Sequence, residues 1–180
     1  MDFNSTFKFL VESFNKENIN FAIIGGFAMQ AYGIARATSD IDLLVIVDDK
    51  DKVKQILLEN GYELKHESDD VMNFFGKNVS RGRLDFLIAH RKYTREMLKR
   101  AEIKKVLGGR YQIKTLTIED QIGLKVQSST NDKTRYNLDL ADIEMLIRGN
   151  KKNLNLDLIR DYFKIFKREE ELDKILENAK

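Results

Sequence analysis

The chain has 180 residues, of which 42% are hydrophobic and 33% charged, and its formal net charge is +2 at pH 7. This length and apolar share suit one domain with a real core and a small appended region. The absence of cysteine excludes a disulfide framework and a thiolate metal site. Since we find no signal peptide and no apolar run long enough to span a bilayer, we expect a cytoplasmic protein without a membrane partner.

Alternating helices and strands are predicted for the N-terminal part. Residues 4–17 have the apolar spacing of an amphipathic helix. A short buried strand then ends in the glycine turn Gly25-Gly26, and Gly33 closes the short helix that follows. The remaining elements are a strand at 40–47, a helix capped by Asp48 or Asp49 and ended by Gly61, strands at 62–66, 71–77 and 82–90, a helix near 93–101, and a hairpin over 103–114 that turns at Gly108-Gly109.

From Thr117 onward only helices are predicted. The first two cover 117–129 and 133–148, the second closed by Gly149, and Thr117 with Asp120 resembles a capping box. Asn155 caps a third helix, and a charged helix ends the chain. The predicted fold class is α+β, with a mixed β-sheet flanked by helices over residues 1–115 and a C-terminal helical region over residues 116–180 packed on it.

One segment concentrates basic charge. Residues 91–114 carry nine Lys or Arg and two acidic residues. The segment is either the solvated surface of a helix and a hairpin or a patch that binds a polyanion. The sequence leaves both interpretations open.

Two carboxylates, Asp40 and Asp42, stand at the start of a strand that otherwise has a buried pattern. Because side chains alternate across a strand, both acids point to one face while Ile41 points to the other. Their Cα atoms lie roughly 7 Å apart, so both carboxylates can reach a common centre. A third acid, Asp85, lies in another apolar strand and joins them if the two strands are neighbours. Oxygen ligands without Cys or clustered His favour Mg²⁺, and two ions would suit phosphoryl transfer.

These acids belong to a longer motif. The stretch IIGGFAMQAYGIARATSDIDLLV resembles the signature of the nucleotidyltransferase-fold superfamily, which is related to DNA polymerase beta, and within it the minimal, AbiEii-toxin-like branch. The resemblance implies that Gly25 and Gly26 hold the nucleotide phosphates and that Asp40, Asp42 and Asp85 are the catalytic, metal-binding acids.

The resemblance runs over most of residues 20–147 and includes a lysine, Lys125, followed by the DLADI segment at 139–143. It implies Mg²⁺-dependent transfer of a nucleoside monophosphate from an NTP to an acceptor hydroxyl, on a tRNA-like RNA 3′ end or a protein. It also implies a toxin–antitoxin or phage-defence component, with a cognate antitoxin as partner.

Two cations have alternative partners. Lys125 falls within an apolar helical stripe, so it either binds the triphosphate or pairs with a core acid such as Asp142. Arg36 meets a phosphate or pairs with a nearby Asp to hold its loop. For Asp139 and Asp142 we prefer a structural role, in which Asp139 pairs with Arg135 four residues earlier.

Phe27 departs from the family pattern, since active members commonly carry Ser or Thr directly after the glycines. The alternative function rests on this position: a non-catalytic module that binds a nucleotide or a partner and has lost turnover. Tyr32, Phe74 and Phe75 could flank a nucleobase, although we consider core packing the better use for them.

Overall fold

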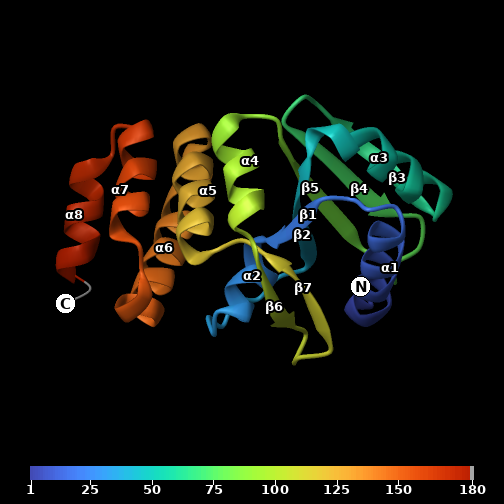
Figure 1. The fold of residues 1–180 in the computed structure, drawn as a ribbon, viewed down its shortest axis with the longest axis horizontal. Coiled ribbons are helices and arrows are strands. Elements are labelled where there is room, and N and C mark those ends of the chain that lie inside the picture. The colour runs from blue at the N-terminus through green and yellow to red at the C-terminus, as the bar shows by residue number, and fades with distance from the viewer. Residues whose placement is uncertain (179–180) are drawn as a thin grey trace. The chain divides into compact units, whose positions relative to one another are not determined.

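The computed structural model describes residues 1–178, which form two compact units. Unit 1 contains residues 1–31 and 35–116, and unit 2 contains residues 32–34 and the chain from Thr117 onward. Unit 1 is a mixed sheet with helices, and unit 2 is helical (Figure 1). The predicted α+β class is therefore confirmed.

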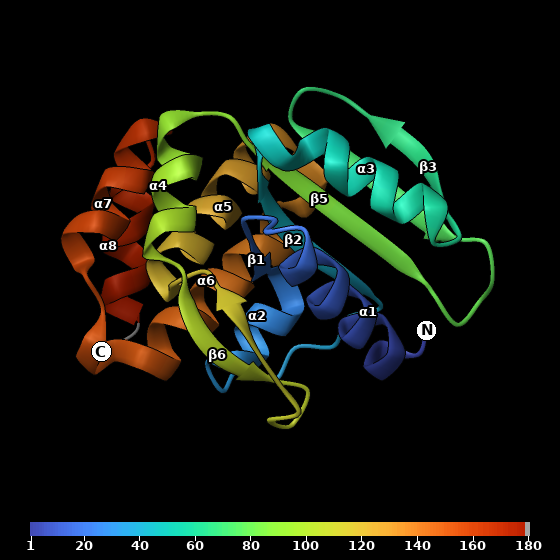
Figure 2. The ribbon, with the colours of Figure 1, turned by 45° about the vertical axis from the view of Figure 1, so that its right-hand side comes forward.

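Unit 1 alternates strands and helices as the sequence predicts, and Figure 2 shows α1 and α3 running in front of the sheet. Its strands are β1 (Phe21–Ile24), β2 (Asp40–Ile46), β3 (Tyr62–Glu67), β4 (Val71–Gly76), β5 (Arg83–Ala89), β6 (Glu102–Val106) and β7 (Tyr111–Thr115). Its α-helices are α1 (Phe3–Lys16), α2 (Gly25–Ala31), α3 (Lys50–Glu59) and α4 (Lys92–Arg100).

The strands form a seven-stranded sheet in the order β3-β4-β5-β2-β1-β7-β6. The central pair, β2 and β5, is parallel, and so is the pair of β1 and β7; the other neighbours are antiparallel. Parallel strands need a crossover connection, and the chain between β2 and β5 supplies it with α3, β3 and β4. Two distant segments of the sequence therefore lie side by side in the middle of the sheet.

The two faces of the sheet carry different residues. Leu43 and Val45 of β2 share a hydrophobic core with Phe7 of α1 and Val53 of α3. Side chains one position along a strand point to the opposite face, which in β2 presents Asp40, Asp42 and Leu44. Leu44 is fully buried, and α4 contacts β2 and β5. The acids therefore lie on the face opposite to the core beneath α1 and α3.

Two predicted helix signals in the sequence were wrong. Asp49 precedes α3 but makes no capping bond; its carboxylate accepts a hydrogen bond of 2.7 Å from the backbone N–H of Asn20 instead. Gly149 does not close its helix, which continues to Asn150. A Cβ at Gly149 would lie 2.6 Å from Ile34 Cδ1, so this glycine serves a close contact within unit 2.

Unit 2 consists of α5 (Ile118–Asn131), α6 (Tyr136–Asn150), α7 (Leu156–Ile165) and α8 (Glu169–Asn178). The predicted caps are confirmed at Thr117, which accepts from the N–H of Asp120, and at Asn155, which accepts from the N–H of Leu158. The buried Asp120 carboxylate also accepts a hydrogen bond of 2.5 Å from the hydroxyl of Tyr162. This bond fixes α7 against the first turn of α5.

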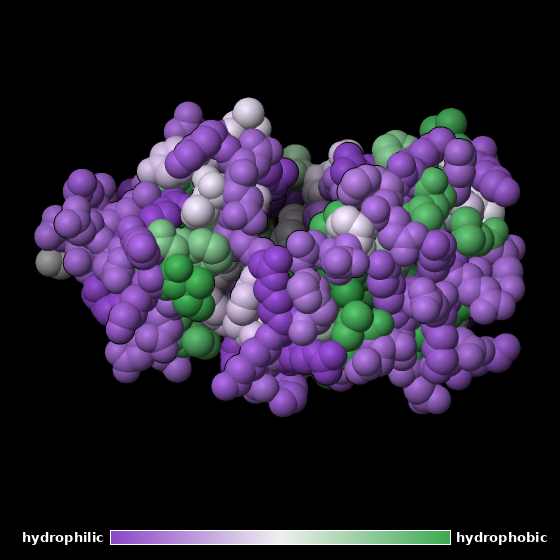
Figure 3. Space-filling view, turned by 90° about the horizontal axis from the view of Figure 1, so that it is seen from above, coloured by the Kyte–Doolittle hydropathy of each residue, from purple (hydrophilic) through white to green (hydrophobic). Residues whose placement is uncertain are grey.

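Most of the exposed surface seen from above is hydrophilic, and hydrophobic residues show there as small separate areas (Figure 3). Within residues 1–178, no helix has the length and apolarity needed to cross a bilayer.

Candidate functional site

The three acids predicted from the sequence come together in unit 1. In the parallel pairing of β2 with β5, Asp42 stands opposite Asp85, and Asp40 lies two residues earlier on the same face. Carboxylate oxygens of Asp40, Asp42 and Asp85 all lie within 4.8 Å of one another. All three residues are partly buried, so the cluster remains accessible from outside the sheet.

This donor set fits a hard divalent cation. Three convergent carboxylates offer only oxygen ligands, which Mg²⁺ prefers over nitrogen or sulfur donors. Their mutual repulsion is costly without a cation between or beside them. The three carboxylates could therefore hold a metal ion between them.

Gly25 is required for this geometry in two ways. Its φ of +64° is a left-handed conformation that favours glycine. A Cβ on Gly25 would lie 2.1 Å from Asp42 Oδ2, so any other residue would collide with that carboxylate. Gly26 is also constrained, because its Cβ would lie 2.7 Å from Thr38 Cβ. The backbone of the glycine turn therefore lies directly against the acid cluster, at the start of α2.

A cation that the sequence analysis did not single out, Arg83, contacts the third acid. Arg83 Nε lies 2.9 Å from Asp85 Oδ1 and 2.8 Å from Oδ2. The hydrogen bond to Asp85 raises the pKa of Arg83, and the charges of Asp85, Asp40 and Asp42 add to this effect. Asn73 Nδ2 donates a further bond of 2.7 Å to Asp85 Oδ1. Arg83 precedes Asp85 by two residues and so shares its face, whereas the contribution of Asn73 depends on the pairing of β4 with β5.

The loop before β2 orients the first acid. Thr38 Oγ1 lies 2.8 Å from Asp40 Oδ1 and 3.2 Å from the Asp40 carbonyl oxygen. Arg36 helps to shape the same loop, because its Nη1 donates to the carbonyl of Ala37 and its own carbonyl accepts from Gln30. Thr38 therefore ties the end of the loop to both the side chain and the backbone of Asp40. The binding of a phosphate by Arg36 stays a prediction.

Phe27 points away from the acids and into the core. It is 4% exposed, and its ring lies edge-on to those of Phe3 and Phe7, with ring centroids 4.9 Å apart in each pair. Such aromatic pairs contribute about 0.5–1.5 kcal/mol beyond their buried area. Phe27 therefore anchors α2 to α1, and the position offers no hydroxyl to a nucleotide.

Lys125 is paired within unit 2. Its Nζ lies 3.1 Å from Asp139 Oδ1 and 2.6 Å from Asp142 Oδ2, and both acids are fully buried. Arg135 Nε adds a contact of 3.3 Å with Asp139 Oδ2, which is the pair expected from their spacing. The core partner considered for Lys125 is therefore present. A role of Lys125 in binding a triphosphate stays a prediction.

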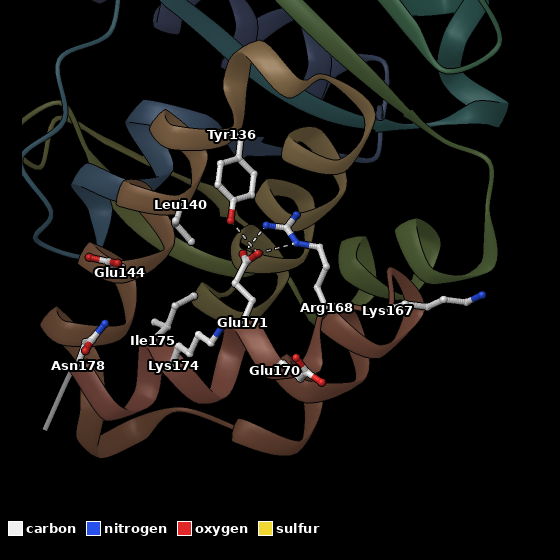
Figure 4. Close-up of a pocket in the computed structure, with 10 residues that line it drawn as sticks. All are labelled: Tyr136, Leu140, Glu144, Lys167, Arg168, Glu170, Glu171, Lys174, Ile175 and Asn178. Atoms are coloured by element: carbon white, nitrogen blue, oxygen red, sulfur yellow. Dashed lines mark hydrogen bonds and ion pairs between the residues drawn. The ribbon is translucent and has the colours of Figure 1, made fainter.

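Unit 2 also contains a pocket of about 410 Å³ lined by residues of α6, α8 and the segment before α8. Figure 4 shows Tyr136 and Arg168 pointing toward Glu171. The Tyr136 hydroxyl donates a bond of 2.9 Å to Glu171, and the Arg168 guanidinium forms an ion pair with the same carboxylate. Arg168 also donates to Ser129 Oγ at 2.7 Å. These groups satisfy one another, so we assign no ligand to this pocket.

The basic segment 91–114 forms α4 and the β6–β7 hairpin of unit 1. Part of its charge is met locally, since Lys99 pairs with Glu96 and Lys104 with Glu102. Lys105 and Arg110 are exposed on the hairpin. Polyanion binding by this segment stays a prediction.

The sheet order, the glycine turn and the convergent acids define the class of protein, a nucleotidyltransferase-fold protein. The chain belongs to a nucleotidyltransferase family: residues 3–180 match the family described as "Uncharacterised nucleotidyltransferase". The resemblance to the nucleotidyltransferase-fold superfamily is thereby confirmed. The AbiEii-toxin-like branch stays a prediction.

Solved structures with similar folds include an antibiotic-resistance factor and an antibiotic adenylyltransferase. The solution structure of the antibiotic-resistance factor ANT(2″)-Ia has a TM-score of 0.68, with 12% identity and 100% of both chains covered. The lincomycin-bound lincosamide antibiotic adenylyltransferase LnuA has a TM-score of 0.53, with 19% identity over 79% of this chain and 94% of that one.

A third similar structure is an antigenic nucleotidyltransferase-like protein from Paracoccidioides brasiliensis, with a TM-score of 0.56 and 18% identity over 93% of this chain and 88% of that one. At such identities the likeness shows the fold alone. A comparison with curated proteins finds no match.

Proposed function

We propose that the protein transfers a nucleoside monophosphate from an NTP to an acceptor hydroxyl, on an RNA 3′ end or a protein, and releases pyrophosphate. The observation that carries this proposal is the convergence of Asp40, Asp42 and Asp85 within 4.8 Å, directly against the glycine turn. Membership of a nucleotidyltransferase family supports the reaction class.

Each residue of the cluster has a part in the proposed reaction. Asp40 and Asp42 would hold Mg²⁺ ions, two of which would supply charge stabilisation for the attacking and leaving oxygens. Asp85 would share in holding metal and help to deprotonate the acceptor hydroxyl. The backbone of Gly25 and Gly26 would bind the phosphates through N–H groups at the start of α2. Catalysis of this kind depends mainly on positioning and on stabilising charge.

The proposal extends to two further cations and to a biological role. Arg36 and Lys125 are candidates for balancing the phosphate charge, and for Lys125 this requires an exchange of partners, because Asp139 and Asp142 hold it now. The AbiEii-toxin-like motif is the reason to propose a cytoplasmic toxin–antitoxin or phage-defence component with a cognate antitoxin.

The test measures transfer of label from NTPs in the presence of Mg²⁺ to total RNA or to cell extract. We expect Asp40→Asn and Asp42→Asn each to lower transfer by about 1,000-fold or more, because a metal ion supplies several kcal/mol and each 1.36 kcal/mol is a factor of ten. Full transfer by both variants would remove the metal-binding role.

A non-catalytic module that binds a nucleotide or a partner is the second candidate. The observation that favours it is Phe27, which is buried in the core and leaves no side-chain hydroxyl directly after the glycines. Under this alternative the wild-type protein would bind NTP with Mg²⁺ but would label no acceptor from any pool.

A further inference from the structure

The face of the sheet that carries the acids continues outward onto β4. Strand pairing sets Asp40 opposite Arg83, and Arg83 opposite Phe75. Because paired residues on neighbouring strands share a face, this row leads from the first acid through Arg83 to Phe75. Strands lie about 4.8 Å apart, so Phe75 is roughly 10 Å across the sheet from Asp40.

Phe75 has an exposed aromatic ring, although the residue before it in β4 is buried. Phe75 is 43% exposed, whereas Phe74, one position earlier and on the other face, is 0% exposed and belongs to the core. The guanidinium carbon of Arg83 lies 5.6 Å from the centroid of the Phe75 ring. The cation and the ring together form a surface beside Asp85.

Arg83 has donors left for a ligand. Its hydrogen bond to Asp85 uses Nε, and within residues 1–178 neither Nη1 nor Nη2 donates a hydrogen bond. The side chain is 46% exposed. Terminal guanidinium N–H groups form a planar fork that suits phosphate oxygens, and a guanidinium would repel a polyamine acceptor as a like charge.

We propose that Arg83 and Phe75 form the acceptor side of the site and that the acceptor is the 3′ end of a single-stranded nucleic acid. The terminal base stacks on Phe75, the last phosphodiester binds Arg83 Nη1 or Nη2, and the 3′ hydroxyl lies at Asp85. The spacing of Phe75, Arg83 and Asp85 on this face of the sheet is comparable to the length of one nucleotide. This inference rests on the proposed transferase function and names its acceptor.

The experiment uses the whole chain and a short 5′-labelled single-stranded RNA with a free 3′ hydroxyl, measured by fluorescence anisotropy and as a transfer substrate. We expect Phe75→Ala to weaken RNA binding about tenfold, within the range measured for the loss of one base–aromatic stack. Phe75→Tyr should restore binding. Leu58→Ala is the matched control, since Leu58 is also 43% exposed and lies on α3, at the opposite face of the sheet.

Arg83 is tested by salt dependence. The logarithm of the RNA association constant falls linearly with the logarithm of the salt concentration. Arg83→Gln should make this slope shallower by about 0.7, the value for one phosphate contact on a single strand. Arg160→Gln, which removes a guanidinium of similar exposure that donates to Asp173, should leave the slope unchanged. Unchanged RNA affinity in Phe75→Ala, or equal losses in Leu58→Ala and Arg160→Gln, would overturn the inference.

A thermal shift on adding Mg²⁺ with NTP, recorded for every variant, separates this inference from the proposed function. Retention of that shift by Phe75→Ala while RNA binding is lost supports the inference. A wild-type protein that labels proteins but binds no RNA overturns the acceptor assignment and leaves the transferase intact. A wild-type protein with neither thermal shift nor transfer overturns both.

Discussion

Asp139 and Asp142 in unit 2 are completely buried, whereas Asp40, Asp42 and Asp85 in unit 1 are only partly buried. Each acid of the unit 2 cluster lies within 3.5 Å of a lysine or arginine nitrogen. In the unit 1 cluster, Asp85 forms an ion pair with Arg83, while Asp40 accepts a hydrogen bond from the neutral hydroxyl of Thr38. Burial with cations in place is typical of a structural cluster, and partial burial with a surplus of carboxylates is typical of a site that receives a cation.

The largest loss of stability should come from substitution of Lys125. This substitution tests most directly whether the unit 2 cluster is structural. Lys125→Met removes the cation that lies 2.6 Å from the buried Asp142. Breaking a buried ion pair from one side costs about 3–5 kcal/mol, so we expect denaturant unfolding at a much lower midpoint. Arg135→Gln is the control: its partner Asp139 keeps Lys125 and the arginine side chain is 48% exposed, so the loss should be under about 1 kcal/mol.

The opposite pattern would contradict this assignment. If Lys125→Met unfolds at the wild-type midpoint and loses the thermal shift on adding NTP, the lysine is a nucleotide ligand.

Gly25→Ala should cause the second-largest loss of stability. It should also abolish transfer. The left-handed backbone costs an alanine about 1–2 kcal/mol, and the new Cβ would overlap Asp42 Oδ2. The matched control is Gly108→Ala, because Gly108 has φ +65° with nothing within 4 Å of its Cβ position. Both variants should melt lower than wild type, but only Gly25→Ala should lose transfer. Equal transfer by the two variants would show that Asp42 need not lie against the glycine turn.

Asp42→Asn should give the smallest change in stability, and it should stabilise the protein rather than destabilise it. Carboxylates held within 4.8 Å of one another repel when no metal is bound, so removing one charge should stabilise the protein in EDTA at neutral pH. The gain should be about 1 kcal/mol, the size of a one-unit pKa shift. Mg²⁺ with NTP should reverse the order, because ligands stabilise only the protein that binds them. A lower melting temperature of the variant in EDTA would instead identify Asp42 as a partner in a structural ion pair.

The convergence of the three acids in unit 1 was largely predictable because its signals are local. Asp40 and Asp42 alternate with buried residues, and Gly25-Gly26 marks the turn, so the sequence indicates both the acids and the close approach of the backbone. Asp85 joins these two acids only if its strand lies next to theirs. The parallel pairing of β2 with β5 fulfils that condition. Membership of the family then confirms the fold that the motif implied.

Apart from Arg83, whose place beside Asp85 follows from their spacing in β5, the missed features depend on register or on competition between partners. Asn73 reaches Asp85 only because β4 pairs with β5 in one register, and a local pattern does not specify that register. Asp49 is an ordinary capping residue by sequence, yet the distant N–H of Asn20 takes its carboxylate. Gly149 has the residue type of a helix end but serves a contact with Ile34. For Asp49 and Gly149, a tertiary contact replaces the predicted local one.

The parallel pairing of β2 with β5 has a consequence for folding kinetics. The acids that it brings together, Asp42 and Asp85, are separated in the chain by α3, β3 and β4. Closing a connection of this length and pairing parallel strands are slow steps, whereas the antiparallel β3–β4 ribbon and α3 need only nearby residues. We therefore expect the local elements to form first and the repulsive carboxylates to meet late. A refolding chain would then assemble the proposed metal site after most of its secondary structure is already in place.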